Sequence, residues 1–238
     1  MRILWINHRD PRHPHAGGAE VRIHQIGKRL AKIGHEVTLL CEEIPKLPRE
    51  ECLDGIYIKR IAGRTLIHLL APLYVRRHQK EYDTVIDDIA HAVPWFSPLT
   101  TKRPVIAQVH HVHQKVTYIE LNKLLGLIVN RAERTIPKIY SHIIAVSNST
   151  KQELIKHLGV DPDRIEVVPN GVDLEEYRPG RKDPRPIILW VGRMKKYKNL
   201  DHLLLAYKMV KDKIPEALLV IIGTGDQEYQ TKMLAKRL

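Results

Sequence analysis

The strongest candidate for a binding site is an apolar strand that ends in glycine and is followed by two cations. The expected strand Ile187–Val191 precedes Gly192 and Arg193, and Lys198 comes shortly before a helix that begins near Asn199. Arginine offers a planar fork for phosphate oxygens, lysine offers a compact charge, and a helix N-terminus favours an anion. A solvated basic loop is the alternative, but the order of strand, glycine, cations and helix favours a phosphate-rich ligand.

Two further loops place glycines next to expected strands. Gly17 and Gly18 separate the first strand from the first helix, and Gly223 begins a Gly-x-Gly loop after the last strand. Glycine lets a ligand come close to the backbone, and the N-terminus of the first helix favours an anion. Turn geometry alone would also explain these glycines.

A group of histidines follows the apolar strand Val105–Val109. Open α/β sheets bind ligands at the carboxyl ends of their strands, so His110 could donate a hydrogen bond to a substrate hydroxyl or take part in proton transfer. A metal site on His111 and His113 is disfavoured, because no cysteine or acidic ligand is paired with them nearby. These two residues also fit the description of polar loop histidines.

Two polar segments follow other expected strands. Asp87 and Asp88 end one of them, and although an acidic pair can hold Mg²⁺, such residues more often cap a strand or bind a polar group, so no metal is assigned. Asn170 and Gly171 follow another strand and favour a tight turn, whether or not their loop also lines a cleft.

Strands and helices alternate along the whole chain. Short, β-branched, nearly continuous apolar runs are typical of strands buried on both faces of a parallel sheet. These runs are Ile3–Asn7, Val37–Cys41, Ile56–Ile61, Thr84–Asp87, Val105–His110, Ile143–Ser147, Ile165–Val168, Ile187–Val191 and Leu218–Ile222. The alternation predicts an α/β fold with a doubly wound, Rossmann-like parallel sheet.

Three of the intervening helices carry end signals. The first begins after Gly18 and ends at Gly34, because glycine commonly terminates a helix. The second begins at Ser149 or Thr150, where Thr150–Glu153 fits a capping box. The third begins near Asn199.

A boundary between two domains is expected in the polar, Pro- and Gly-rich stretch 175–186. We therefore predict domains at residues 1–178 and 179–238. Ile3–Ile6 resembles Ile188–Val191, which suggests two similar α/β units. The second is much shorter than a usual domain of about 100 residues, so we expect it to be incomplete.

The composition indicates which classes of binding partner and which cellular compartment to expect. The net charge of +12 favours an anionic partner, but scattered basic residues and an aromatic content of only 5% argue against nucleic acid. Two cysteines suggest no disulfide framework, so the reducing cytoplasm is expected. No apolar run is long enough to span a bilayer.

Two segments, 64–77 and 121–136, mix apolar and basic residues. Such segments could lie on the inner face of an anionic membrane as a peripheral contact. We favour the other interpretation, a pair of helices that face the core and leave their charges in solvent.

Taken together and in this order, the motifs resemble the retaining glycosyltransferases of the GT-B fold, in particular those of family 4. The residues that carry the resemblance are Gly17-Gly18-Ala19-Glu20, His110, Val146-Ser147-Asn148-Ser149-Thr150, Pro169-Asn170-Gly171-Val172-Asp173, Val191-Gly192-Arg193 with Lys198, and Ile222-Gly223-Thr224-Gly225. The resemblance implies two Rossmann-like domains, with a nucleotide-sugar donor mainly on the second and a glycan or lipid-linked acceptor mainly on the first.

The resemblance also implies roles for single residues. Arg193 and Lys198 would hold the donor diphosphate and stabilise charge on the leaving group, without a metal or another cofactor. His110 would face the transferred sugar. The donor-binding glycines would be Gly17, Gly18, Gly192 and Gly223. The residues on the acceptor side or in the cleft would be Asp87, Ser147 and Asn170.

The chain departs from the family at one point. The family's paired glutamates, separated by seven residues, cannot be placed before Leu238. We therefore expect a C-terminally truncated chain whose 238 residues show weak or no transferase activity. A non-catalytic module that binds a sugar, a nucleotide or a phospholipid is the alternative. A dinucleotide-dependent enzyme is disfavoured, because no Gly-x-Gly-x-x-Gly follows the first strand.

Overall fold

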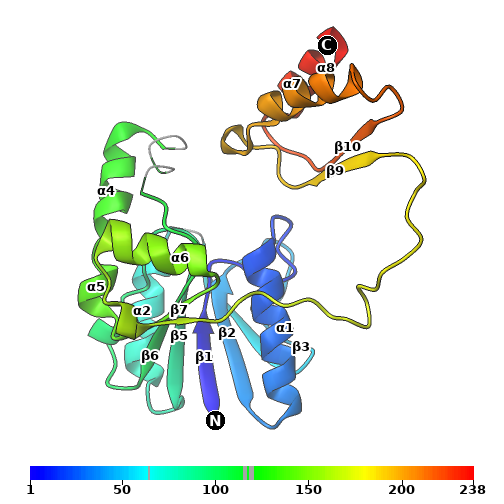
Figure 1. The fold of residues 1–238 in the computed structure, drawn as a ribbon. Coiled ribbons are helices and arrows are strands. Elements are labelled where there is room, and N and C mark those ends of the chain that lie inside the picture. The colour runs from blue at the N-terminus through cyan, green and yellow to red at the C-terminus, as the bar shows by residue number, and fades with distance from the viewer. Residues whose placement is uncertain (64, 115–116, 118–120) are drawn as a thin grey trace. The chain divides into compact units, whose positions relative to one another are not determined.

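The computed structural model describes residues 1–63, 65–114, 117 and 121–238, and it contains two compact units (Figure 1). The first unit is Met1–Val172 and the second is Asp173–Leu238. The sequence placed this boundary later, between residues 178 and 179. Residues 173–186 contain no helix or strand, and by their contacts they belong with the second unit.

The first unit is built on one eight-stranded sheet in the order β3-β4-β2-β1-β5-β6-β7-β8. Every neighbouring pair is parallel except β3 with β4. The strands are β1 (Arg2–Ile6), β2 (Glu36–Glu42), β3 (Glu50–Leu53), β4 (Ile56–Ala62), β5 (Thr84–Ile89), β6 (Val105–Val109), β7 (His142–Ala145) and β8 (Ile165–Val167). The predicted α/β fold with a parallel sheet is confirmed.

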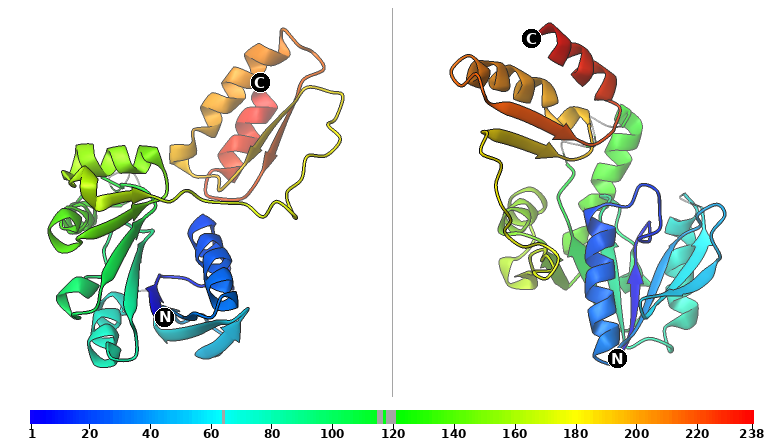
Figure 2. Two further views of the ribbon diagram at one scale, coloured as in Figure 1. Left: turned by 60° about the horizontal axis from the view of Figure 1, so that its bottom comes forward. Right: turned by 90° about the vertical axis from the view of Figure 1, so that its right-hand side faces the viewer.

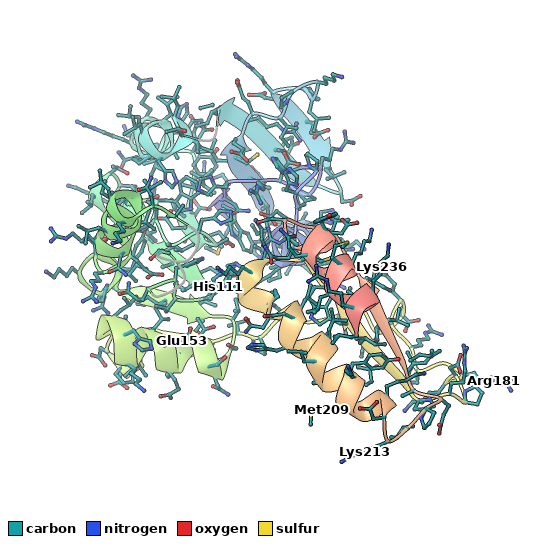
Figure 3. All side chains as sticks on the ribbon, turned by 90° about the horizontal axis from the view of Figure 1, so that it is seen from above. His111, Glu153, Arg181, Met209, Lys213 and Lys236 are labelled. Carbon is teal, nitrogen blue, oxygen red and sulfur yellow. The ribbon has the colours of Figure 1, made fainter. Side chains whose placement is uncertain are left out.

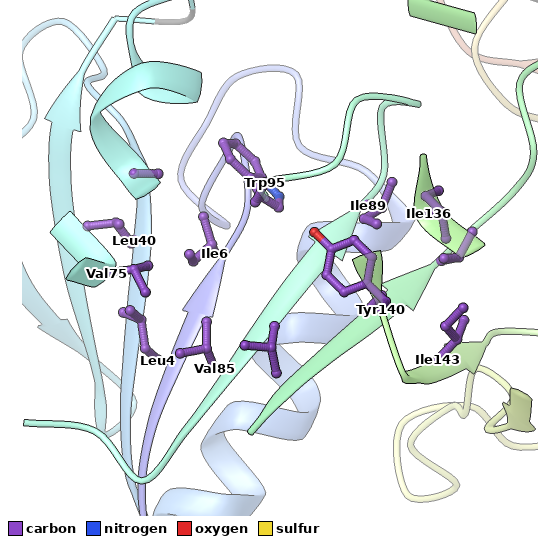
Figure 4. Packing of buried hydrophobic residues seen from close by; sticks show 14 of the residues in the cluster. Leu4, Ile6, Leu40, Val75, Val85, Ile89, Trp95, Ile136, Tyr140 and Ile143 are labelled. Carbon is purple, nitrogen blue, oxygen red and sulfur yellow. The ribbon is translucent and has the colours of Figure 1, made fainter. Parts of the chain in front are cut away.

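Helices cover both faces of this sheet, because successive residues of a buried strand point to opposite sides. Trp5 of β1 packs in one apolar cluster with Ile23 of helix α1 (Gly18–Lys32). Its neighbour Leu4 packs in the other cluster with Ala71 of helix α2 (Ile67–His78) (Figures 2 and 4). The sheet is therefore doubly wound.

Strand β3 was not predicted from the sequence. It forms an antiparallel hairpin with β4 through Asp54 and Gly55, whose φ angles are 50° and 84°. Asp-Gly is a frequent pair in two-residue hairpin turns, which need positive φ. The polar sequence Glu-Glu-Cys-Leu hides the strand from a search for apolar runs, because this edge strand is largely exposed.

Further helices in the described part of the first unit connect the later strands. They are α4 (Lys123–Glu133), α5 (Ile136–Ile139), α6 (Asn148–Glu153) with a π-helical continuation (Leu154–Leu158), and the 3₁₀ turns Ser97–Leu99 and Pro162–Arg164. The predicted start of α6 was wrong. Ser147, not Thr150, is the N-cap, and its Oγ accepts a hydrogen bond from the Thr150 backbone N–H (3.1 Å).

Two helices keep apolar residues on the exposed side. Leu69 of α2 and Leu124 of α4 are 67% and 72% exposed, although Ile67 of α2 is fully buried. The expected core-facing orientation of segments 64–77 and 121–136 is thus correct for part of their apolar residues only. Arg64, the first residue of the former segment, lies outside the described residues.

The second unit is a smaller α/β arrangement. Its parallel strands are β9 (Ile187–Val191) and β10 (Leu218–Ile222), both with the predicted bounds. Its helices are α7 (Leu200–Lys211) and α8 (Glu228–Arg237), with a 3₁₀ turn at Lys196–Lys198. Across the described parts of both units, no helix has the length and hydropathy that crossing a bilayer requires.

Candidate functional site

His110 lies at the carboxyl end of β6 and contacts a buried carboxylate of β5. Its Nε2 atom is 2.8 Å from Asp88 Oδ1, and the Asp88 side chain has no exposed surface. This contact has an ion-pair distance without a straight N–H···O bond, and Oδ1 accepts no other hydrogen bond within the described residues. Asp88 Oδ2 accepts hydrogen bonds from Trp5 Nε1 (3.2 Å) and Gln108 Nε2. The carboxylate is therefore fixed from behind and presents its free side to His110.

A second set of contacts links this pair to the loop after β8. Arg22 of α1 donates from Nε to Gln108 Oε1 (3.1 Å) and from a terminal nitrogen to Pro169 O (3.0 Å) and Asn170 Oδ1 (2.9 Å). Burial lowers the pKa of Arg22, while the charge of Asp88 raises it. These hydrogen bonds run from one loop to the next through buried polar side chains. The turn at Asn170 and the imidazole of His110 therefore belong to one polar network.

Helix α6 supports the backbone of His110. Thr150 lies in the first turn of α6, and its hydroxyl donates to the His110 carbonyl oxygen (3.1 Å). Ser147, predicted to line the cleft, caps this helix and lies 2.9 Å from Thr150 Oγ1. The structure thus places Ser147 beside the backbone of His110, with a hydroxyl that is already used in capping.

The loop with Gly17 and Gly18 follows β1 and leads into α1. Because β1 and β6 are both parallel to β5, which lies between them, this loop and His110 are at the same edge of the sheet. The Gly17 N–H donates to Glu20 Oε2 (2.7 Å), and Glu20 Oε1 accepts from Asn7 Nδ2 (3.2 Å). A Cβ added to Gly18 would meet no described atom within 4 Å. The fold itself therefore does not require a glycine at residue 18, which leaves room there for a ligand.

Asp87, which the resemblance placed on the acceptor side or in the cleft, lies in the interior of the first unit. It is fully buried on the opposite face of β5 from Asp88, because neighbouring side chains alternate along a strand. Its carboxylate accepts hydrogen bonds from Ser97 Oγ (2.6 Å), the Ser97 N–H (3.2 Å) and Tyr140 Oη (2.6 Å). Burial raises the pKa of Asp87 to about 6, although the hydrogen bonds from Ser97 and Tyr140 act in the opposite direction.

The other two histidines of the loop after β6 lie near α4. His113 donates its backbone N–H to Glu133 Oε1 (2.7 Å), and its ring is 4.4 Å from the ring of His111. Within residues 1–63, 65–114, 117 and 121–238, no group of three His, Cys, Asp or Glu side chains is arranged to hold a metal ion.

In the second unit, the loops after β9 and β10 are joined backbone to backbone. Gly192 N–H donates to Ile222 O (3.0 Å), and Met194 N–H donates to Thr224 O (2.8 Å). Gly223 has φ +149°, and a Cβ there would collide with the carbonyl oxygen of Gly192. This close approach explains why residue 223, which lies against the backbone of Gly192, is a glycine.

The two predicted cations lie on this joined pair of loops and are exposed. Lys195 of the same loop is paired with Asp226 (2.8 Å), whereas no described carboxylate lies within ion-pair distance of Arg193 or Lys198. Lys198 Nζ is 5.1 Å from the ring centroid of Tyr197, at the turn that leads into α7. Both side chains therefore keep their charge available for an anion.

Sequence reasoning missed Asp88, Gln108 and Arg22 as members of the first site. Gln108 did leave a signal, because it is a polar residue inside the apolar strand Val-Ile-Ala-Gln-Val. Arg22 left none, since its partner Asn170 is 148 positions away in the chain.

The fold of this chain is of the GT-B class, and glycosyltransferases are among the solved structures that share it. Sucrose-phosphate synthase from Thermosynechococcus elongatus matches with a TM-score of 0.71 at 18% identity, over 99% of this chain and 66% of that chain. WaaG, a glycosyltransferase involved in lipopolysaccharide biosynthesis, matches with a TM-score of 0.63 at 15% identity, over the same shares of the two chains.

Family models identify the family. The model of Glycosyltransferase Family 4 matches residues 16–176, and the model of Glycosyl transferases group 1 matches residues 173–238. The chain belongs to glycosyltransferase family 4, as its motifs predicted.

Two curated relatives match different shares of the chain. A D-inositol 3-phosphate glycosyltransferase of Rhodococcus jostii is 26% identical over 88% of this chain and 53% of its own length. A UDP-Gal:alpha-D-GlcNAc-diphosphoundecaprenol alpha-1,3-galactosyltransferase of Escherichia coli is 33% identical over 55% of this chain and 39% of its own length. The chain spans about half the length of the curated relatives it matches.

Proposed function

We propose that this chain carries the acceptor-side domain and the first part of the donor-side domain of a retaining glycosyltransferase. The enzyme transfers a sugar from a nucleotide-diphosphate donor to a glycan or lipid-linked acceptor. The proposal draws support from both curated relatives, whose names describe glycosyl transfer, and from the polar loops at the carboxyl ends of the parallel strands. We place the enzyme in the cytoplasm.

One observation carries the proposal. Arg193 and Lys198 are exposed, have no carboxylate partner among the described side chains, and lie on loops whose backbones are joined at Gly192 and Gly223. Two cations on a preorganised backbone stabilise negative charge that develops on a leaving diphosphate. Because these cations supply the positive charge, the transfer proceeds without a metal ion.

The first unit receives the acceptor. His110 faces the transferred sugar, and Gly17 and Gly18 let the donor or acceptor approach the start of α1. Ser147 and Asn170 lie on the loops next to these residues, and Asp87 is replaced in this role by Asp88, which contacts His110 directly. Attack on the face from which the diphosphate leaves retains the anomeric configuration.

The experiment measures donor binding by the full-length protein with UDP-, GDP- and ADP-sugars. Arg193→Ala and Lys198→Ala are each expected to weaken binding of the preferred donor by about 10- to 100-fold, because each removes a charge-assisted hydrogen bond to phosphate. Lys213→Ala is the matched control, since Lys213 is an exposed lysine beyond the other end of α7 (Figure 3).

The outcomes separate an enzyme from a binding module. Transfer that survives chelation of divalent metals and gives a product with the donor's anomeric configuration by NMR supports the proposal in full. Equal effects of the three substitutions on donor binding would contradict the role of Arg193 and Lys198. Binding without any turnover by the full-length protein would favour the non-catalytic module.

We further propose that the first unit contacts the inner face of an anionic membrane peripherally. Helix α4 supports this, because its polar side faces the interior of the unit and its apolar side is exposed. Gly126, Asn130 and Glu133 are on the buried side, whereas Leu124 and Ile128 are 72% and 57% exposed.

Polar contacts account for the orientation of α4. Glu133 accepts hydrogen bonds from the backbone N–H groups of His113 (2.7 Å) and Gln114 (3.1 Å), and Asn130 Nδ2 donates to Gln114 O (3.1 Å). These contacts hold the polar side inward and leave the leucines outward. Exposed Lys123 and Arg131 on the same helix complement anionic lipid headgroups.

Liposome flotation tests the membrane contact. The full-length protein is expected to float with vesicles of phosphatidylcholine and phosphatidylglycerol, and to do so less as salt rises. The L124S/I128S double variant should reduce flotation, whereas L99S/L174S, which alters leucines with 70% and 73% exposure elsewhere, should not. Flotation that is absent, or that both double variants reduce equally, would reject the contact.

A further inference from the structure

The loop of residues 7–17, which connects β1 to α1, is held to the neighbouring strands by charged side chains (Figure 1). We propose that Asp10 of this loop and Arg60 of β4 are positioning residues. Their buried ion pair fixes the loop, and the fixed loop places the backbone of Gly17 and Gly18 for binding of the nucleotide-sugar donor. The donor as ligand rests on the proposed function, whereas the anchoring of the loop rests on contacts within the first unit alone.

Three ion pairs between guanidinium and carboxylate groups join the loop to the strands, and their charges alternate. The pairs are Arg9 with Glu42 of β2 (3.7 Å), Asp10 with Arg60 of β4 (2.7 Å) and Arg12 with Glu51 of β3 (3.0 Å). The loop thus presents a cation, an anion and a cation, and the strands present the opposite charges. A loop residue opposite the wrong strand residue would bring like charges together, so the pattern favours one placement of the loop.

The pair of Asp10 and Arg60 is the buried one of the three. Its side chains are 0% and 1% exposed, whereas the side chain of Arg12 is 47% exposed. Arg60 donates from Nε to Asp10 Oδ2 (2.7 Å), and its terminal nitrogens donate to Pro48 O (2.6 Å) and to Glu51. Exposed ion pairs contribute little, so the buried pair is the main anchor of the loop.

Apolar packing does not hold this loop. Among residues 9–18, all of which the structure describes, Asp10 alone is buried. A buried ion pair gives little net stability, because taking the charges out of water costs about as much as their attraction returns. Apolar side chains of similar volume would support the fold equally well. The charged pair therefore serves to give the loop one defined position.

Hydrogen bonds connect Asp10 to the glycines. Asp10 Oδ1 accepts from the Arg12 N–H (2.7 Å), and the Asp10 carbonyl oxygen accepts from the His13 N–H (3.1 Å). The His13 carbonyl oxygen in turn accepts from the Ala16 N–H (2.8 Å), and Ala16 directly precedes Gly17. A displacement of Asp10 is therefore passed along the loop to the start of α1.

The double variant D10N/R60M tests the pair, because it removes both charges together. Arg60→Met alone would leave the Asp10 carboxylate buried without its partner, which costs stability whatever the loop does. In the double variant the introduced asparagine can still accept from the Arg12 N–H, so the local turn is kept. R2M/D83N is the matched control, because it makes the same two substitutions in an ion pair at the opposite edge of the sheet.

Hydrogen–deuterium exchange of the full-length protein tests the anchoring without reference to any activity. Peptides that cover residues 7–19 should exchange about 10-fold faster in D10N/R60M than in wild type, because the loop then opens more often. Peptides from β5 should be unchanged, and R2M/D83N should leave the loop peptides as in wild type. Unchanged exchange of the loop in D10N/R60M would overturn the inference and leave the proposed function intact.

Steady-state kinetics connect the loop to the donor. A loop that is placed correctly in only a tenth of the molecules raises the apparent dissociation constant about 10-fold. KM for the donor should therefore rise about 10-fold in D10N/R60M, while kcat stays close to wild type. A merely structural role would reduce the folded fraction, which lowers kcat at unchanged KM.

The kinetic outcomes separate this inference from the proposed function. Lower kcat at unchanged KM, or equal effects of D10N/R60M and R2M/D83N, would overturn the positioning role. A rise in KM for the acceptor alone would overturn the donor as the ligand of the loop. Absence of transfer by wild-type full-length protein would contradict the proposed function, and the exchange measurement would still decide whether Asp10 and Arg60 anchor the loop.

Discussion

Asp87→Asn is expected to change how the stability of the first unit depends on pH. Asp87 is fully buried, and burial raises its pKa from 3.8 to about 6. The hydrogen bonds from Ser97 and Tyr140 to the carboxylate lower this pKa and so limit the shift. Asparagine has nearly the same shape, can accept from Tyr140 and can donate to Ser97 Oγ, but it does not titrate.

Whether Asp87 stabilises or destabilises the fold as the pH rises depends on the direction of its pKa shift. The folded protein holds the Asp87 proton more tightly than the unfolded chain, so this group stabilises the fold below pH 3.8. That stabilisation is lost as the pH rises from 3.8 through about 6, because the ionised carboxylate is then buried in the folded state. The shift of about two pKa units corresponds to a loss of about 3 kcal/mol.

Urea unfolding of wild type and Asp87→Asn between pH 4 and pH 7.5 measures this effect. The free energy of unfolding of the variant, minus that of wild type, should increase by about 3 kcal/mol over this range. Asp83→Asn is the comparison, since Arg2 lowers the pKa of Asp83 and the difference should then change in the opposite direction. A pH-independent difference for Asp87→Asn would refute the reasoning.

Two further predictions concern single contacts. Gly223→Ala should lower the free energy of unfolding of the second unit by about 3 kcal/mol, because φ is +149° and Cβ would collide with Gly192, while Gly180→Ala, which meets no described atom within 4 Å, should have little effect. Ser147→Ala should lower the free energy of unfolding of the first unit by about 1 kcal/mol through loss of the α6 cap, whereas the exposed Ser141→Ala should not, as chemical denaturation of each variant would show.

The strands were predictable because their burial leaves a direct trace in the sequence. β1 and β2 are apolar runs whose residues are mostly buried. The predicted limits of β9 and β10, two more exposed apolar runs, agree with the structure. β3 left no such trace, since an exposed edge strand can contain two adjacent glutamates. Its only local signal was the Asp54-Gly55 turn.

The candidate site was only partly predictable. His110 could be located because it follows a strand, and the carboxyl end of a strand is known once the strand is known. Which carboxylate would face His110 could not be predicted, because Asp87 and Asp88 differ only in the face of β5 that each one takes. Arg22 joins the site across most of the first unit, and no local pattern encodes such a contact.

The adjacent carboxylates of β5 impose a constraint on the evolution of this strand. Asp87 accepts hydrogen bonds from Ser97 and Tyr140 in the interior, and Asp88 contacts His110 at the candidate site. Loss or gain of one residue in β5 would exchange the two faces and remove both sets of contacts together. Point substitutions can accumulate along this strand one at a time, whereas a change in its length would have to be compensated at once in the core and at the site.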